Sequence, residues 1–189
     1  MSDPLLHTTT LEAHSEARND AVRSIEVRVS RLQSGALMMS YVLDADLDCL
    51  RIPRLHLPRI GDRLWQHTCF EFFVKRKDGP AYYEFNFSPS GEWAAYAFER
   101  YREAAALGQK ALKPSISVRK TATKLELDVA LDLHGLSSRH AAQALTLAIS
   151  AVIEAGDGSL SYWALRHPAG KPDFHHSDAF VLELDEIRD

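Results

Sequence analysis

Two neighbouring runs of aromatic residues constrain the fold of this chain more than any other feature. From Leu64 the sequence reads LWQHTCFEFFV, and after turn residues at 78–80 it reads AYYEFNFSPSGEW. Runs rich in Phe and Tyr that are bounded by turn residues predict antiparallel β-strands. Each run also has a carboxylate at its centre, Glu71 and Glu84, and an acid is costly inside an aromatic sheet face unless it is paired or solvated.

Alternation along a strand divides the side chains of these runs between two faces. The face expected to belong to the core holds Phe70, Phe72, Val74, Tyr83, Phe85 and Phe87. If the strands pair, Glu71, Glu84 and Asn86 gather on the opposite face. Two acids and an amide on one face form a candidate site for a polar ligand. The alternative is a structural network in which an arginine such as Arg166 neutralises the acids.

Short strands separated by turns account for most of the remaining chain. The clearest is 124–132, where apolar residues at 125, 127, 129 and 131 alternate with polar ones and should be buried. Further strands are predicted at 23–29, 36–43, 68–76, 81–87, 93–98, 116–122, 145–153, 160–166 and 180–184. This pattern of about ten short strands with little helix predicts an all-β fold, an antiparallel β-sandwich of jelly-roll-like type.

Three segments interrupt the strands. Residues 44–63 contain two prolines and a glycine and predict a long loop. Residues 99–114 predict a short helix or a loop, and residues 134–143 predict a short polar link.

The N-terminal residues 1–22 predict a separate segment or an edge strand, which Leu5, Leu6 and Leu11 could hold in place. We expect residues 23–189 to form a single domain.

Composition and charge argue against several classes of protein. The net charge of −4 disfavours binding to nucleic acid, because phosphate-binding domains carry a basic excess. No apolar run approaches the roughly 20 residues of a membrane span, and the N-terminus does not resemble a secretory signal. Two cysteines, Cys49 and Cys69, do not make a disulfide framework. A cytoplasmic protein that binds neither nucleic acid nor membrane is therefore expected.

A second dense segment, SYWALRHPAGKPDFHHSD, lies near the C-terminus. A strand here runs into a loop stiffened by two prolines, and such a loop is typical of the rim of a binding site. Its candidate hydrogen-bonding residues are Arg166, His167, Lys171, Asp173 and His175. His175, His176 and Asp173 are possible metal ligands, but adjacent histidines in an extended segment point apart, and no metal site is predicted.

Three tryptophans, Trp65, Trp93 and Trp163, lie at strand edges or beside polar clusters. A flat indole can stack on a sugar ring or a porphyrin, and core packing is the alternative for each of them.

Haem is a possible cofactor, with Met38, Met39, His67 or the C-terminal histidines as axial ligands. None of these residues has a diagnostic spacing, so no cofactor is predicted and haem remains an alternative. The chain contains no glycine-rich phosphate loop, GxSxG or HExxH motif.

The two aromatic blocks and the block YWALRHPAGKPDFHH resemble bacterial DOMON-like domain proteins over roughly residues 23–185. These proteins are similar to family 9 carbohydrate-binding modules and to the cytochrome domain of cellobiose dehydrogenase. The resemblance implies a β-sandwich that binds a sugar or haem.

The sequence thus predicts a domain that binds a small ligand, most simply a carbohydrate or sugar derivative, rather than an enzyme. The alternatives are a haem-binding domain, a sugar-processing enzyme that uses Glu71 and Glu84, and an interaction module with an exposed apolar patch. The oligomeric state is not defined. The predicted ligand-binding residues are Trp65, Glu71, Glu84, Asn86, Trp93, Trp163, Arg166, His167, Lys171, Asp173 and His175.

Overall fold

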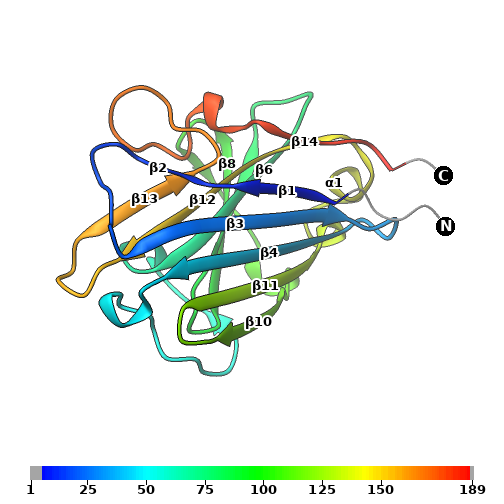
Figure 1. Cartoon of the computed structure of the whole chain (residues 1–189). Helices are drawn as coiled ribbons and strands as arrows, with labels where there is room; N and C mark the ends of the chain where they lie inside the picture. Colours follow the sequence, from blue (N-terminus) through cyan, green and yellow to red (C-terminus); the bar gives the residue numbers. More distant parts are fainter. Residues whose placement is uncertain (1–5, 188–189) are drawn as a thin grey trace.

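Two β-sheets pack face to face in the computed structural model, which describes residues 6–187 (Figure 1). The first sheet is antiparallel and has the order β1 (His7–Thr10), β3 (Val22–Arg31), β4 (Ala36–Ala45), β11 (Lys124–Asp132) and β10 (Ser115–Lys120). The second sheet has the order β2 (Glu12–Ala13), β13 (Leu160–Ala164), β12 (Leu145–Glu154), β6 (Cys69–Arg76), β7 (Tyr82–Phe87), β8 (Glu92–Arg100) and β5 (Arg59–Ile60). The predicted antiparallel sandwich is confirmed.

Three short strands complete the second sheet. β14 (Leu182–Leu184) pairs with β12, and β9 (Glu103–Ala105) pairs with β8. β5, inside the segment predicted to be a loop, runs parallel to β8. Every other strand pairing within the described residues is antiparallel, and β6, β7 and β8 follow one another as hairpins.

Helical structure in the described residues is confined to short segments. They are α1 (Ser138–Ala142) and the 3-10 turns η1 (Leu47–Cys49), η2 (Leu64–Gln66), η3 (Gln109–Ala111), η4 (Leu133–Gly135) and η5 (Ser177–Ala179). The segment 99–114 forms β9 and η3 in place of an α-helix, because the chain turns back at Arg102 (φ 56°) and β9 pairs with β8. The predicted polar link at 134–143 instead contains α1, whose N-terminus is capped by the Ser137 hydroxyl.

The N-terminal segment contributes an edge strand to each sheet. β1 pairs with β3 in the first sheet and β2 pairs with β13 in the second. Leu11 lies between the two strands and is buried in the core, whereas Leu6 is exposed. Leu5, which was also expected to hold this segment, lies outside the described residues.

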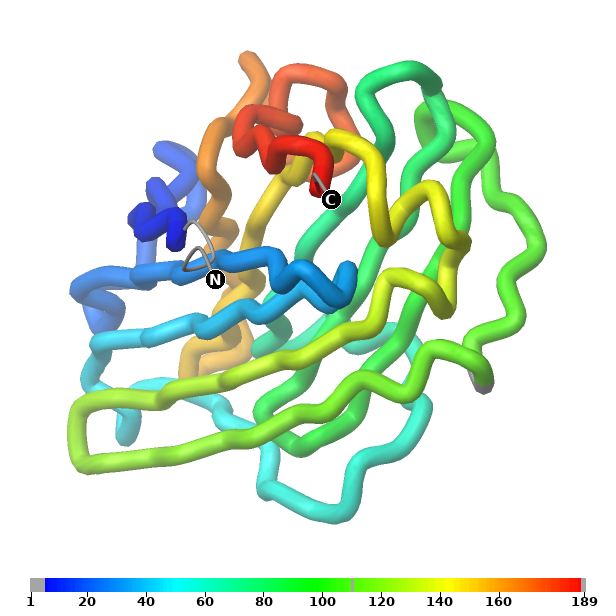
Figure 2. Tube along the Cα trace, turned by 90° about the vertical axis from the view of Figure 1, so that its right-hand side faces the viewer, coloured from blue at the N-terminus to red at the C-terminus, as the bar shows by residue number. Residues whose placement is uncertain are grey.

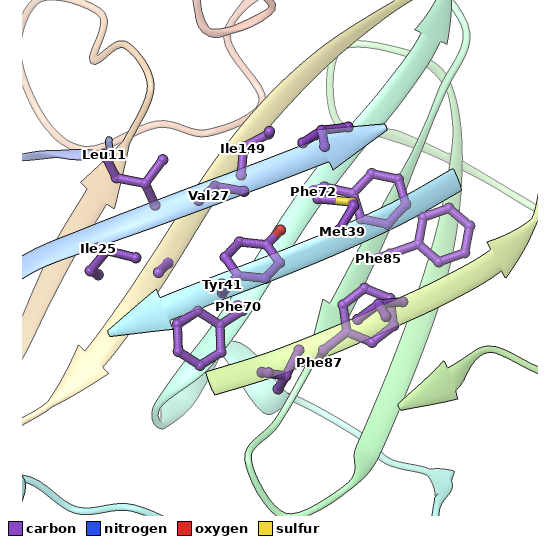
Figure 3. Close-up of a cluster of buried hydrophobic side chains, with 14 of the residues drawn as sticks. Leu11, Ile25, Val27, Met39, Tyr41, Phe70, Phe72, Phe85, Phe87 and Ile149 are labelled. Atoms are coloured by element: carbon purple, nitrogen blue, oxygen red, sulfur yellow. The ribbon is translucent and has the colours of Figure 1, made fainter. Parts of the chain in front are cut away.

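The core fills the space between the two sheets (Figure 3). Phe70, Phe72 and Phe85 are fully buried, as predicted, and the rings of Phe72 and Phe85 stack with centroids 4.7 Å apart. Tyr83 was expected to be buried as well but is only half-buried, because it lies near the end of β7 against the edge of the His140 ring. The apolar residues of β11 at 125, 127, 129 and 131 are buried, as their alternation predicts.

The central strands of the second sheet are buried on both faces. All ten residues of β12 are buried, including Thr146, Ser150 and Glu154. Here the face that points away from the first sheet is called the outer face. Figure 2 shows the C-terminal part of the chain, orange to red, returning beside the strands of this sheet. Phe174 and Phe180 from that part pack on Phe73 and neighbouring residues, so the outer face carries a second apolar cluster.

Candidate functional site

A pocket of about 520 Å³ opens on the outer face of the second sheet. Its volume falls within the range usual for small-molecule sites. Glu71 of β6 and Glu84 of β7 line it, together with Val152 of β12 and Leu160 of β13. Five aromatic side chains contribute to its lining: Trp65, Tyr96, Phe98, Tyr162 and Phe174.

Local structure explains why these side chains meet. Tyr96 and Phe98 alternate with the core-facing residues of β8, and Tyr162 alternates with those of β13. Both strands therefore direct aromatic rings to the outer face. Trp65 belongs to η2, which is anchored by the packing of Leu64 near Cys69. The Trp65 ring meets Tyr96 edge-on with centroids 5.8 Å apart, and 40% of the Trp65 surface remains exposed.

Glu71 and Glu84 are called the acid pair. Glu71 lies opposite Asn86 in the ladder between β6 and β7, and Glu84 lies two residues before Asn86 on the same face. The two glutamates are therefore diagonal neighbours, within reach of each other across the sheet. Both are buried, and they line the same pocket, as their alternation predicts.

Burial shifts the protonation of the acid pair. Loss of hydration raises the pKa of Glu84 from 4.5 to about 7, against the lowering effects of the Asn86 hydrogen bond and the Arg102 charge. Burial and then the charge of Glu84 raise the pKa of Glu71 well above its usual range. Near neutral pH the pair therefore retains a proton, since two adjacent buried carboxylates cannot both ionise at low cost.

Glu84 belongs to a chain of contacting polar side chains. Asn86 Nδ2 donates to Glu84 Oε1 at 2.9 Å, and His175 Nε2 lies 3.5 Å from Glu84 Oε2. On the other side of the imidazole, His175 Nδ1 is 2.8 Å from the Tyr82 hydroxyl, which accepts the backbone N–H of Arg102. Burial and then the charge of Arg102 lower the pKa of His175 to about 4, so this ring is neutral at pH 7.

Glu71 has fewer partners than Glu84. The Ser150 hydroxyl donates to Glu71 Oε2 at a long 3.5 Å, and Glu71 Oε1 is buried without a hydrogen-bond partner among the described residues. The Oδ1 of Asn86, which lies opposite Glu71 in the ladder, is also buried without a partner among the described residues, but Asn86 is not part of the pocket lining. Buried polar atoms are nearly always satisfied, so the orphaned Glu71 Oε1 at the pocket marks a place for a ligand or water.

The rim loop (residues 166–176) borders the pocket through Pro172, Phe174 and His175. Asp173 anchors it to the turn after β8, accepting hydrogen bonds from the Tyr101 hydroxyl at 2.6 Å and from Arg102 at 2.8 Å. Burial alone would raise the pKa of Asp173, but these hydrogen bonds outweigh it and lower the pKa.

The other end of the rim loop is tied to the N-terminal segment. His14 Nε2 lies 2.9 Å from the Gly170 carbonyl, and His167 Nε2 lies 2.9 Å from the Glu12 carbonyl. The two imidazole rings meet edge-on at 4.9 Å. β2 therefore helps to hold the loop in place over the sheet.

Several predicted site residues lie elsewhere. Trp93 and Trp163 are buried in the core between the sheets, because their positions on β8 and β13 fall in the inner phase. Arg166 and Lys171 are exposed, and the pocket lining within the described residues includes neither of them. Arg166 does not supply the suggested counter-charge; the charge of Arg102 lowers the pKa of Glu84, but its guanidinium pairs with Asp173. His167 is used in the contact with β2.

Sequence reasoning also missed part of the lining. Alternation along β8 and β13 could have identified Tyr96, Phe98 and Tyr162, since each lies at an alternate position of its strand that points to the outer face. Arg102 reaches the pocket only because the chain reverses in a left-handed turn, for which the sequence carries no local glycine signal. Gln66 lies in η2, where strand alternation does not apply.

Metal-binding and membrane-spanning features were also sought. Within residues 6–187, no group of three or more His, Cys, Asp or Glu side chains is placed to hold a metal ion. No helix in that range is long and apolar enough to cross a lipid bilayer.

Comparison with known proteins places the fold. No protein-family model matches the chain, and no curated protein matches it by sequence. The structure is similar to the crystal structure of a proposed carbohydrate-binding protein from Bacteroides uniformis ATCC 8492, with a TM-score of 0.62 and 15% sequence identity. The match covers 93% of this chain and 84% of that chain. At this level of identity the similarity establishes the shared β-sandwich fold.

Proposed function

We propose that this protein is a DOMON-like β-sandwich that binds a small ligand, a carbohydrate or sugar derivative, in the pocket on the outer face of its second sheet. The observation that carries the proposal is the combination of aromatic walls with a fixed polar floor. Trp65 and Tyr162 offer flat apolar surfaces, and Glu71 and Glu84 offer hydrogen-bonding groups. Sugar rings need both, since they have apolar C–H faces and polar edges.

Two further observations support a sugar. The pocket floor is held by strand register and buried hydrogen bonds, so little ordering is needed on binding. The similar fold of the proposed carbohydrate-binding protein from Bacteroides uniformis is consistent with this ligand class.

The residues present do not fit a haem with protein-supplied axial ligands. His175 is the one histidine in the pocket lining of the described chain, and both of its nitrogens face partners, Tyr82 and Glu84. Met39 is buried between the sheets and Met38 lies on the far side of the first sheet. His67 pairs with Glu154. These positions favour a sugar over haem.

Replacing Trp65 with Ala should weaken sugar binding by at least roughly tenfold, or about 1.4 kcal/mol. The half-exposed indole can stack on a ligand, and its loss should change the free energy of unfolding by less than about 1 kcal/mol. A thermal-shift screen of neutral, acidic and aminated mono- and disaccharides would identify the sugar, and titration calorimetry would compare the variants.

Met38→Ala provides the matched control, because Met38 is an exposed apolar residue on the opposite side of the sandwich. Unchanged affinity of the Trp65→Ala variant would show that Trp65 does not stack on the ligand. If no sugar in the screen raises the melting temperature, the proposal of a carbohydrate ligand is wrong.

A sugar-processing enzyme is the second candidate, and the protonation of the acid pair favours it. A carboxyl with a pKa of about 7 beside a second carboxyl can serve as a general acid in glycoside hydrolysis. Release of nitrophenol from nitrophenyl glycosides, lost in Glu84→Gln, would favour the enzyme over the binding domain.

A further inference from the structure

Once both of its carboxyls ionise, the acid pair carries more negative charge than its surroundings neutralise. Arg102, the one cation in the pocket lining of the described chain, is bound to Asp173 at 2.8 Å. His175 beside Glu84 is neutral at pH 7, and the other recorded partners of the pair are the uncharged Asn86 and Ser150. If both carboxyls ionise, the pocket keeps two negative charges that the protein does not balance.

The unpaired atom on the pocket floor, Glu71 Oε1, is a hydrogen-bond acceptor with no donor among the described residues. Asn86, opposite Glu71 in the β6–β7 ladder, also has an unpaired Oδ1 but lies outside the pocket lining. An ammonium group carries three N–H donors and no acceptor, which matches the carboxylate oxygens of the acid pair. Charge-assisted hydrogen bonds to a carboxylate are also stronger than hydrogen bonds from a neutral hydroxyl.

The walls of the pocket suit a cation as well. Trp65, Tyr96, Phe98, Tyr162 and Phe174 line the same space as the acid pair. The faces of aromatic rings attract cations, most strongly where water is excluded. Acidic oxygens at the base of an aromatic enclosure therefore favour a positively charged group over a neutral one.

We propose that the carbohydrate bound in this pocket carries an ammonium group, as an amino sugar does, and that Glu71 and Glu84 bind that group. The inference rests on the proposed carbohydrate-binding function and specifies its ligand class. The aromatic walls contact the sugar ring, and the ammonium group supplies the missing donors. On binding, the acid pair loses the protons that it holds and becomes fully ionised, so binding of the cation releases protons.

This proton release predicts a pH dependence of binding. The groups that face the acid pair keep one charge state between about pH 5.5 and about pH 7. The thiol of Cys69 and the phenols of Tyr41, Tyr82 and Tyr96 have raised pKa values, and the pKa of His175 is about 4. The pKa of Asp173 is lowered and that of Arg102 is raised. The affinity for a cation should therefore rise with pH in this range because of the acid pair alone.

The test is titration calorimetry with D-glucose, D-glucosamine and N-acetyl-D-glucosamine, and with the three matching galactose compounds. An amino sugar should bind at least about tenfold more tightly than its neutral and acetylated counterparts at about pH 7. Its affinity should rise by about tenfold per pH unit for each proton released, whereas the affinity for the neutral sugar should change little. Titrations in buffers of different ionisation enthalpy would measure the released protons directly.

Glu71→Gln keeps the size of the side chain and removes its charge, so it should abolish the preference for the amine. Glu126→Gln is the matched control, because Glu126 pairs with Arg119 on the first sheet, away from the pocket. Equal binding of neutral and aminated sugars by the native protein would overturn the ammonium inference and leave carbohydrate binding intact. Failure of every sugar to bind would overturn both. The comparison of sugars uses the native protein, so it remains a valid test even if the Glu71→Gln variant does not fold.

Discussion

Replacing Phe72 with Ala should lower the free energy of unfolding by about 3–5 kcal/mol, the usual cost of deleting a buried aromatic ring. Phe72 is fully buried on the inner face of β6 (Figure 3). Its ring stacks on Phe85 at 4.7 Å, with an interplanar angle of 7°, and also lies 6.0 Å from Phe87. The variant would leave a cavity between two packed sheets, and stiff strands can close such a cavity only in part.

Chemical denaturation monitored by tryptophan fluorescence would measure this loss. The midpoint should fall while the slope of the transition stays constant, since the surface exposed on unfolding is nearly the same. Leu57→Ala is the surface control, because Leu57 is 86% exposed, and it should change stability by less than about 0.5 kcal/mol. A loss below about 1.5 kcal/mol for Phe72→Ala would contradict the stacked core.

The second large effect concerns the stability of the acid pair as a function of pH. The folded-state pKa of Glu84 is about 7, above its ordinary 4.5, so the unfolded chain loses this proton first as the pH rises. The stability that comes from the neutral carboxyl is complete below the ordinary pKa and disappears as the pH rises through the folded-state pKa. Between these values stability falls by about 1.4 kcal/mol per pH unit for each such carboxyl, or about 3 kcal/mol for Glu84.

The double variant Glu71→Gln/Glu84→Gln has no titrating carboxyl at these two positions, so its stability lacks this pH dependence. It should be close to the native protein in stability at about pH 4.5 and become more stable than it as the pH approaches about 8. Thermal unfolding of both proteins across this range would measure the widening difference. Glu92→Gln is a control of opposite sign, because hydrogen bonds from Arg59 and Ser90 outweigh burial and lower the pKa of Glu92. A constant difference at all pH values would contradict the raised pKa of the acid pair.

Local patterning predicted the sheet faces well. The period of two along β6, β7 and β11 separates core residues from outward ones by steric geometry alone, so the buried set and the acid pair followed from the sequence. The same rule applied to β8 separates Trp93 from Tyr96 and Phe98 but does not say which of the two faces is the core. Trp93 pairs with Phe87 and must therefore share its face.

That pairing depends on the turn between β7 and β8, where Gly91 adopts φ 89° and donates to the Ser88 carbonyl. Turn residues indicate that the chain reverses but do not fix the register of the two strands by themselves. The sequence alone therefore did not decide on which face of the sheet Trp93 lies.

The rest of the candidate site is formed by contacts between distant segments. Arg102 enters the pocket through a left-handed turn and through the hydrogen bond of its backbone to Tyr82. Phe174 and His175 arrive from a loop whose position depends on Asp173 and on the ties to β2. Such arrangements arise from tertiary packing and leave no periodic signal in the sequence.

The order in which the pocket is built follows from the position of its parts along the chain. The acid pair and the rings of β8 are synthesised early, but Phe174 and His175, which cover and partner them, belong to the C-terminal part. During translation the outer face of the second sheet must remain uncovered until the rim loop has left the ribosome. Until the rim loop docks, Glu84 lacks its contact with His175, so part of the environment that buries this carboxyl and raises its pKa comes from the C-terminal part of the chain. Docking of the rim loop is therefore the step that completes the surroundings of Glu84.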